Sequence, residues 1–149
     1  MRACGAHLER PHLMSEIEQQ LLDLTRRLLE AVYRRDTDFY RAHATDDMTA
    51  YEWFIAPERI PGLDFHLHLM SAGGMVGVDE NARVDLLNPE VRLLGAGGDA
   101  ALVTFTLLVT YPAEGSGKPS FYSDHQTRVF ERSGDTWKMV HFHRSPPHA

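Results

Sequence analysis

The hydrophobic residues of this chain change their spacing near Asn81, and that change limits the folds available to it. Before Asn81, apolar residues recur every three or four positions, which is the spacing of one helix face. The main stripe consists of Ile17, Leu21, Leu24, Leu28 and Val32. Ser15-Glu16-Ile17-Glu18 has the form of a capping box, so we predict a helix that begins after Ser15 and continues to about Tyr33.

Two shorter helices and a run of strands follow. Asp36 suits the N-cap of a second helix, and Pro61-Gly62 precedes a third from Asp64 to about Met70. After Asn81, apolar and polar residues alternate, which predicts strands at 83–87, 91–94, 101–111, 120–131 and 137–143. Short connections favour an antiparallel meander, and Asn88-Pro89 predicts a bulge. Helices followed by strands indicate an α+β fold, with a strongly curved antiparallel sheet around the long N-terminal helix.

Alternation along each strand also predicts which side chains share a face. The inner face is expected to carry Phe105, Leu107, Val109 and Tyr111, then Asp124, Gln126 and Arg128, then Phe142 and Arg144. The outer face is expected to carry Leu108, Val129, Trp137, Met139, His141 and His143. Monomeric proteins seldom expose such a patch, so we predict that a second copy of the chain covers it. A loop or the Pro146-Pro147 tail is the alternative cover.

Composition excludes several classes of partner and site. Fifteen Lys and Arg against 21 Asp and Glu give a formal charge of −6, which disfavours nucleic acid as a partner. The longest apolar run is too short to span a bilayer, so no membrane association is expected. Cys4 is the only cysteine, which excludes an internal disulfide and a multi-cysteine zinc site.

The start of the chain has no recognisable secretory signal, which predicts a cytoplasmic protein. Residues 1–14 lack hydrophobic periodicity and are expected to be a flexible leader. Residues 15–147 are expected to form one domain, because a chain of 149 residues has the length of a single ordinary domain.

Four segments carry a resemblance to a known family: PGLDFH at 61–66, LLNPEV at 86–91, QTRV at 126–129 and WKMVHFHRS at 137–145. Their order and spacing resemble the association (hub) domain of calcium/calmodulin-dependent protein kinase II, from about Glu16 to Pro147. The resemblance implies the cone-shaped α+β fold of the nuclear transport factor 2-like, cystatin-like and SnoaL-like proteins. It also implies homo-oligomerisation, as a homodimer at least and in the kinases as a two-layered dodecameric or tetradecameric ring. No kinase activity is expected, because the chain has no glycine-rich phosphate loop.

The resemblance further implies an arginine-lined pocket that takes small anions. Arg128 and Arg144 match two of the family's arginines, His66 matches a histidine at the pocket mouth, and Glu52 matches a glutamate after the first strand. Tyr111, on the predicted inner face, completes the expected set of ligand-binding residues. Two departures are expected to weaken or reshape the site: Leu107 stands where many relatives place a third arginine, and Gly73-Gly74 replaces a bulkier helix end.

Elementary electrostatics gives the arginines two alternative explanations. A buried guanidinium without a partner is costly, so Arg128 and Arg144 need either internal carboxylates or a bound anion. The candidate internal partners are Glu52, Asp64 and Asp124. The sequence is therefore consistent with two alternatives: a saturated internal salt-bridge network, or a site for a small carboxylate.

An isomerase, dehydratase or cyclase is the alternative function. Asp124 would act as the base, Tyr111 would stabilise an enolate and His66 would carry protons. Two inward arginines make a neighbouring aspartate a weaker base, so we do not expect catalysis or a cofactor. His141 and His143 have a spacing that can bind zinc, but no third and fourth ligands accompany them, so no metal is expected.

Overall fold

The computed structural model describes residues 14–72 and 79–147. The helices are α1 (Glu16–Arg34), α2 (Thr37–Ala42) and α3 (Leu63–Ser71). The strands are β1 (Ala44–Glu52), β2 (Ile60–Pro61), β3 (Arg83–Leu94), β4 (Ala100–Tyr111), β5 (Ser120–Ser133) and β6 (Thr136–Ser145). The predicted leader, apart from Met14, and the Gly73-Gly74 departure lie outside the described residues.

The long helix α1 begins as predicted. The Ser15 hydroxyl accepts from the Glu18 amide at 3.2 Å, and the Glu18 carboxylate accepts from the Ser15 amide at 2.6 Å, so the capping box is confirmed. The helix ends at Arg34, and the next residue, Arg35, caps it in a left-handed conformation (φ 56°) with its amide bonded back to α1 carbonyls. Its buried face is rotated from the predicted stripe: Leu21 and Leu28 are fully buried, but Ile17, Leu24 and Val32 are only partly buried.

The strands form one six-stranded sheet in the order β2-β1-β6-β5-β4-β3. Strands β3 to β6 pair antiparallel in sequence order, which confirms the predicted meander. The register of β3 against β4 shifts between Leu87 and Glu90, and Asn88 has a φ of 47°, so the predicted bulge is present. Strand β1 lies parallel to β6, a pairing between distant segments that local sequence patterns do not reveal.

The two faces of β6 carry different residues from those predicted. The register between β5 and β6 shifts between Val129 and Phe130, so that Phe130 pairs with Met139 but Val129 pairs with His141. This irregularity reverses the alternation at Val140. Trp137 (4% exposed) and Met139 (0%) therefore belong to the core with Phe142, and their predicted place on the outer face is wrong.

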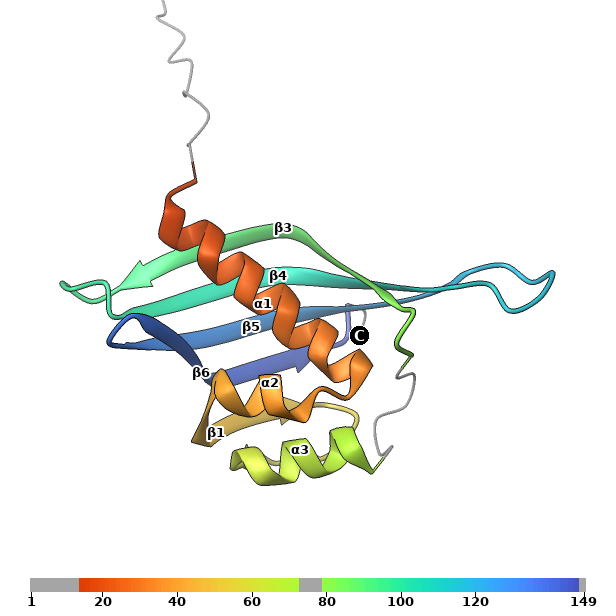
Figure 1. The fold of residues 1–149 in the computed structure, drawn as a ribbon, viewed down its shortest axis with the longest axis horizontal. Helices are drawn as coiled ribbons and strands as arrows, with labels where there is room; N and C mark the ends of the chain where they lie inside the picture. Colours follow the sequence, from red (N-terminus) through yellow and green to blue (C-terminus); the bar gives the residue numbers. More distant parts are fainter. Residues whose placement is uncertain (1–13, 73–78, 148–149) are drawn as a thin grey trace, which may run out of the picture.

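The helices leave one face of the sheet open. In Figure 1, α1 crosses the sheet diagonally in front of β3 to β6, and α2 and α3 lie on the same side near β1. From Ala100 to Thr110, the side chains of β4 alternate between partly buried and buried, which marks the outer and inner faces. No described element covers the outer face of β4 to β6.

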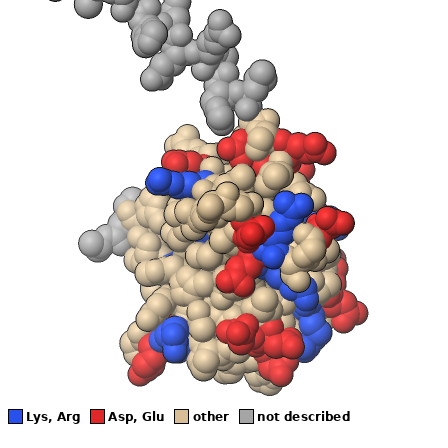
Figure 2. Space-filling model, turned by 90° about the vertical axis from the view of Figure 1, so that its left-hand side faces the viewer, with Lys and Arg blue, Asp and Glu red and all other residues tan. Residues whose placement is uncertain are grey.

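The surface carries charges of both signs. Acidic and basic side chains are interspersed over the end of the molecule shown in Figure 2. Within 14–72 and 79–147, no helix is long and apolar enough to cross a membrane.

Candidate functional site

Three strands bring the polar inner residues together. The register sets Glu52 of β1 opposite Arg144 of β6, and Arg144 opposite Gln126 of β5. Asp124, Gln126 and Arg128 follow at alternate positions of β5 and all point to the inner face, as predicted. The parallel pairing of β1 with β6 therefore places the Glu52 carboxylate beside the arginines.

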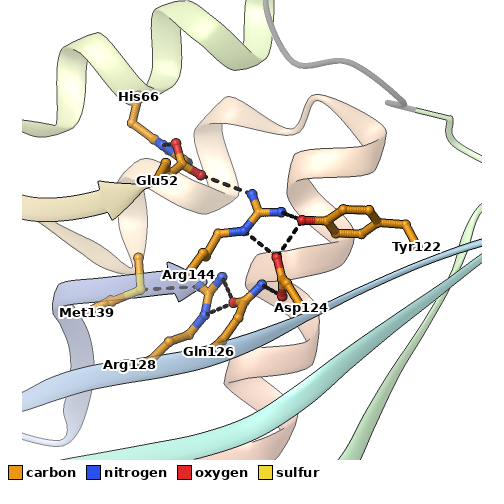
Figure 3. A network of polar contacts seen from close by, with 8 residues as sticks. All are labelled: Glu52, His66, Tyr122, Asp124, Gln126, Arg128, Met139 and Arg144. Carbon is orange, nitrogen blue, oxygen red and sulfur yellow. Dashed lines mark hydrogen bonds and ion pairs between the residues drawn. The ribbon is translucent and has the colours of Figure 1, made fainter. Parts of the chain in front are cut away.

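Arg144 holds both inner carboxylates, as Figure 3 shows. Its Nε donates to Asp124 Oδ2 at 2.8 Å, and its Nη1 donates to Glu52 Oε1 at 3.0 Å. Its Nη2 donates to the Tyr122 hydroxyl at 3.1 Å, and that hydroxyl donates to Asp124 at 2.8 Å. The Phe54 ring lies 4.8 Å from the guanidinium carbon. For Arg144, the salt-bridge explanation is therefore the one the structure supports.

Arg128 has a different set of contacts. Its Nε and Nη2 donate to the Gln126 side-chain oxygen at 3.2 and 3.0 Å, and its Nη1 lies 3.3 Å from Met139 Sδ. The side chain is buried, with 2% exposed, and its hydrogen-bond acceptors among the described residues are neutral. The Arg128 guanidinium therefore has no carboxylate in direct contact among the described residues, unlike that of Arg144.

A small cavity lies beside the two arginines. Its volume is about 20 Å³, and its polar lining consists of Tyr33, Tyr40, Glu52, His66, Arg128 and Arg144. Within the described part of the chain, Tyr40 Oη, Glu52 Oε2 and His66 Nε2 are buried without a hydrogen-bond partner. Glu52 Oε2 lies 3.8 Å from His66 Nδ1, which is too long for a hydrogen bond.

Burial sets the protonation of the lining. Burial, reinforced by Arg128 and Arg144, lowers the pKa of His66 to about 3, so the imidazole is neutral at physiological pH. Burial raises the pKa of Glu52 and outweighs the opposing attraction of Arg144. Burial also raises the pKa of Tyr40 to about 12 and lowers the pKa of Arg128.

Comparison with known proteins identifies the family. The model of the calcium/calmodulin dependent protein kinase II association domain matches residues 17–148. The chain belongs to this family. The delta subunit of calcium/calmodulin-dependent protein kinase type II from Oryctolagus cuniculus is 31% identical over 128 residues, which are 86% of this chain and 23% of that protein. The chain thus spans about a quarter of the curated relatives it matches.

Solved structures agree with this family and with the fold. The association domain of C. elegans CaMKII matches with a TM-score of 0.73 and 26% identity, covering 87% of this chain and 95% of that one. A nuclear transport factor 2-like protein from Salmonella enterica matches with a TM-score of 0.70 and 16% identity, covering 92% and 95%. The second match concerns the fold alone, and it confirms the predicted nuclear transport factor 2-like architecture.

In this association domain, four of the five predicted pocket residues line one cavity. They are Glu52, His66, Arg128 and Arg144, whereas Tyr111 lines a separate cleft with Asp79 and Lys118. Leu107 is fully buried in the cavity wall. The prediction of Asp64 as an internal partner is wrong, because Asp64 lies on the surface and pairs with Arg41 at 3.0 Å.

The predicted catalytic set does not assemble in this association domain. Both Asp124 oxygens already accept hydrogen bonds, from Gln126, Tyr122 and Arg144. Tyr111 lines the separate cleft, and His66 lines the cavity beside the arginines. Asp124 is therefore a structural acceptor that holds Arg144 in place.

Tyr40 of α2 is a further residue of the cavity wall that the sequence did not indicate, and its hydroxyl has no hydrogen-bond partner among the described residues. Its ring lies against the His66 ring, with centroids 4.8 Å apart. The sequence does predict that Tyr40 lies on a short helix capped by Asp36. That signal does not reveal that α2 packs beside α3 and brings the two rings together.

The outer face of the association domain combines hydroxyls, imidazoles and apolar side chains. Val129 lies between Leu102 and His141, and His143 lies beside Tyr51. The His141 ring bonds to the Thr49 hydroxyl across β1 and β6 at 2.7 Å. Phe121, two-thirds exposed, and Tyr51 add aromatic surface that the sequence analysis did not single out. Among the described residues, no group of three or more His, Cys, Asp or Glu is placed to hold a metal ion.

Proposed function

We propose that the chain is a homo-oligomerising association domain whose minimum unit is a dimer formed through the outer face of β4 to β6. Family membership supports this function. The choice of surface rests on one observation: no described element covers this face, yet it holds Val129, Leu108 and Phe121, with Tyr51 beside them on β1. A two-fold dimer brings the same patch of each copy together. A ring of twelve or fourteen copies is the larger assembly implied by the resemblance.

Replacing Val129 with glutamate should at least halve the mass of the particle. The substitution places a charge at a position that is half-buried in one copy and would be fully desolvated between two copies. Light scattering after size-exclusion chromatography measures the mass, and circular dichroism checks the fold. Leu93→Glu is the matched control, because Leu93 lies opposite Ala101 on the other face of the sheet and is 39% exposed. Equal masses for wild type and Val129→Glu would contradict the proposed surface.

A second property, binding of a small carboxylate beside Arg128, is supported by one observation. Arg144 already holds Glu52 and Asp124, but the Arg128 guanidinium is buried with neutral acceptors. The cavity beside it is lined by polar atoms that have no hydrogen-bond partner within the described residues. An anion there would give the Arg128 guanidinium a charged acceptor in direct contact. The cavity of about 20 Å³ favours the smallest carboxylates, since one water molecule needs about 10–15 Å³ on a comparable measure.

Formate should bind to the wild type, and Arg128→Met should weaken that binding at least about tenfold, because a charge-assisted hydrogen bond contributes about 1.5–3 kcal/mol. Isothermal calorimetry measures the affinity, first with formate and then with short hydroxy and keto acids. Arg132→Met is the matched control, since Arg132 is an exposed arginine on the same strand. Unchanged formate affinity in Arg128→Met would contradict this assignment.

A further inference from the structure

We propose that the pocket beside Arg128 takes up an anion together with one proton, and that the proton goes to Oε2 of Glu52. This inference rests on the proposed carboxylate site and adds a regulation to it. The anion brings one negative charge into the cavity, and the solvent supplies one proton to the Glu52 carboxylate. The cavity therefore keeps its total charge.

The charges around Glu52 sum to zero before an anion binds. The cations that face it are Arg144 on β6 and Arg128 on β5, and the other anion is Asp124 on β5. The neutral titratable groups around it come from all three helices and β5, and they are Tyr33, Tyr40, His66 and Tyr122. Two positive and two negative charges cancel, so a bound anion alone would leave one excess negative charge in a buried space. Such a charge is costly without a partner.

Glu52 Oε2 is the group in the cavity that is best placed to accept a proton. Glu52 is 1% exposed, and its Oε1 accepts from Arg144 while its Oε2 is buried without a hydrogen-bond partner among the described residues. Asp124 is a poorer acceptor, because both of its oxygens already receive hydrogen bonds. His66 is also a poorer acceptor, because burial and the two arginines disfavour its charged form. The raised pKa of Glu52 is consistent with this choice.

Protonation of Glu52 turns an acceptor in the cavity wall into a donor. An ionised Oε2 is an acceptor only and repels an anion, whereas a protonated Oε2 carries a hydrogen that it can donate. Glu52 would then join the Arg128 guanidinium as a donor group facing the anion. Arg144 keeps its hydrogen bond to Oε1 in either form, since a protonated carboxyl retains acceptor capacity.

The coupling predicts that the formate affinity falls about tenfold per unit of rising pH wherever Glu52 is ionised in the unbound protein. Formate titration calorimetry on the full chain tests this directly. At one pH and ionic strength, the heat is measured in Tris and in imidazole, two cationic buffers with different enthalpies of ionisation. The difference between the heats gives the number of protons taken up, which should be close to one. Repeating the titration between pH 6 and pH 8.5 gives the slope of affinity against pH.

Glu52→Gln should bind formate with no proton uptake and with an affinity that does not change with pH. Asp64→Asn is the matched control, because Asp64 is a carboxylate on the surface and should leave the proton count unchanged. Formate binding to the wild type without proton uptake would overturn the coupling and leave the pocket standing. Proton uptake that persists in Glu52→Gln would overturn the assignment to Glu52. No formate binding to the wild type at any pH would overturn both the pocket and the coupling, while leaving homo-oligomerisation untouched.

The wild-type measurements decide the coupling even if Glu52→Gln does not fold. A proton count near zero together with a flat pH profile would overturn it. A count near one with a tenfold loss of affinity per pH unit would support it, and circular dichroism identifies a variant that has lost its fold.

Discussion

Replacing Arg144 with methionine should lower the free energy of unfolding by about 3–5 kcal/mol at neutral pH. Arg144 is the shared cation of Glu52 and Asp124, which are 1% and 0% exposed. Methionine fills a similar space but removes the direct ion pair of both buried carboxylates. The loss is therefore the cost of uncompensated buried charge and exceeds the value of an ordinary hydrogen bond.

Urea denaturation at one protein concentration measures this loss, since the stability of an oligomer depends on concentration. Arg41→Met is the matched control. Arg41 also pairs with one aspartate, Asp64, at 3.0 Å, but both side chains are more than half exposed, so the loss should stay below about 1 kcal/mol. Equal losses in the two variants would show that the Arg144 network does not stabilise the fold.

Acidification from pH 7 to pH 4 should destabilise the wild type by about 3 kcal/mol more than the His66→Gln variant. The pKa of His66 is lowered from 6.5 to about 3 in the folded chain. Between these values, the unfolded chain binds a proton that the folded chain excludes, so stability falls as the pH falls. The raised pKa of Glu52 acts in the opposite direction, because its stabilising effect is lost as the pH rises. Glu52 is present in both proteins, so the comparison isolates His66.

Unfolding curves at half-unit pH steps measure the two profiles at fixed protein concentration. His68→Gln is the control, because His68 is exposed on the same helix and its profile should follow that of the wild type. Parallel profiles for the wild type and His66→Gln would contradict the burial of a neutral imidazole in the cavity wall.

The candidate site was predictable wherever a single strand places its members. Asp124, Gln126 and Arg128 share a face because side chains alternate along β5, and this alternation is visible in the sequence. The same rule failed on β6, since the irregularity at Val140 inserts one residue and moves Trp137 and Met139 into the core. A one-residue shift of this kind depends on pairing with β5, which the order of residues on β6 alone does not express.

Local chemistry along the chain determined the elements: the Ser15 capping box, the Asp36 cap, the bulge at Asn88 and the inner face of β4 all follow from neighbouring residues. The tertiary structure alone decided how the charges are divided. The parallel pairing of β1 with β6 brings Glu52 to Arg144, and the pairing of β5 with β6 brings Asp124 to it. Arg128 is left with neutral acceptors, beside atoms of Tyr40, His66 and Glu52 that have no hydrogen-bond partner among the described residues. Spacing in the sequence determines local geometry, whereas the partner of a buried charge depends on which distant segments pack together.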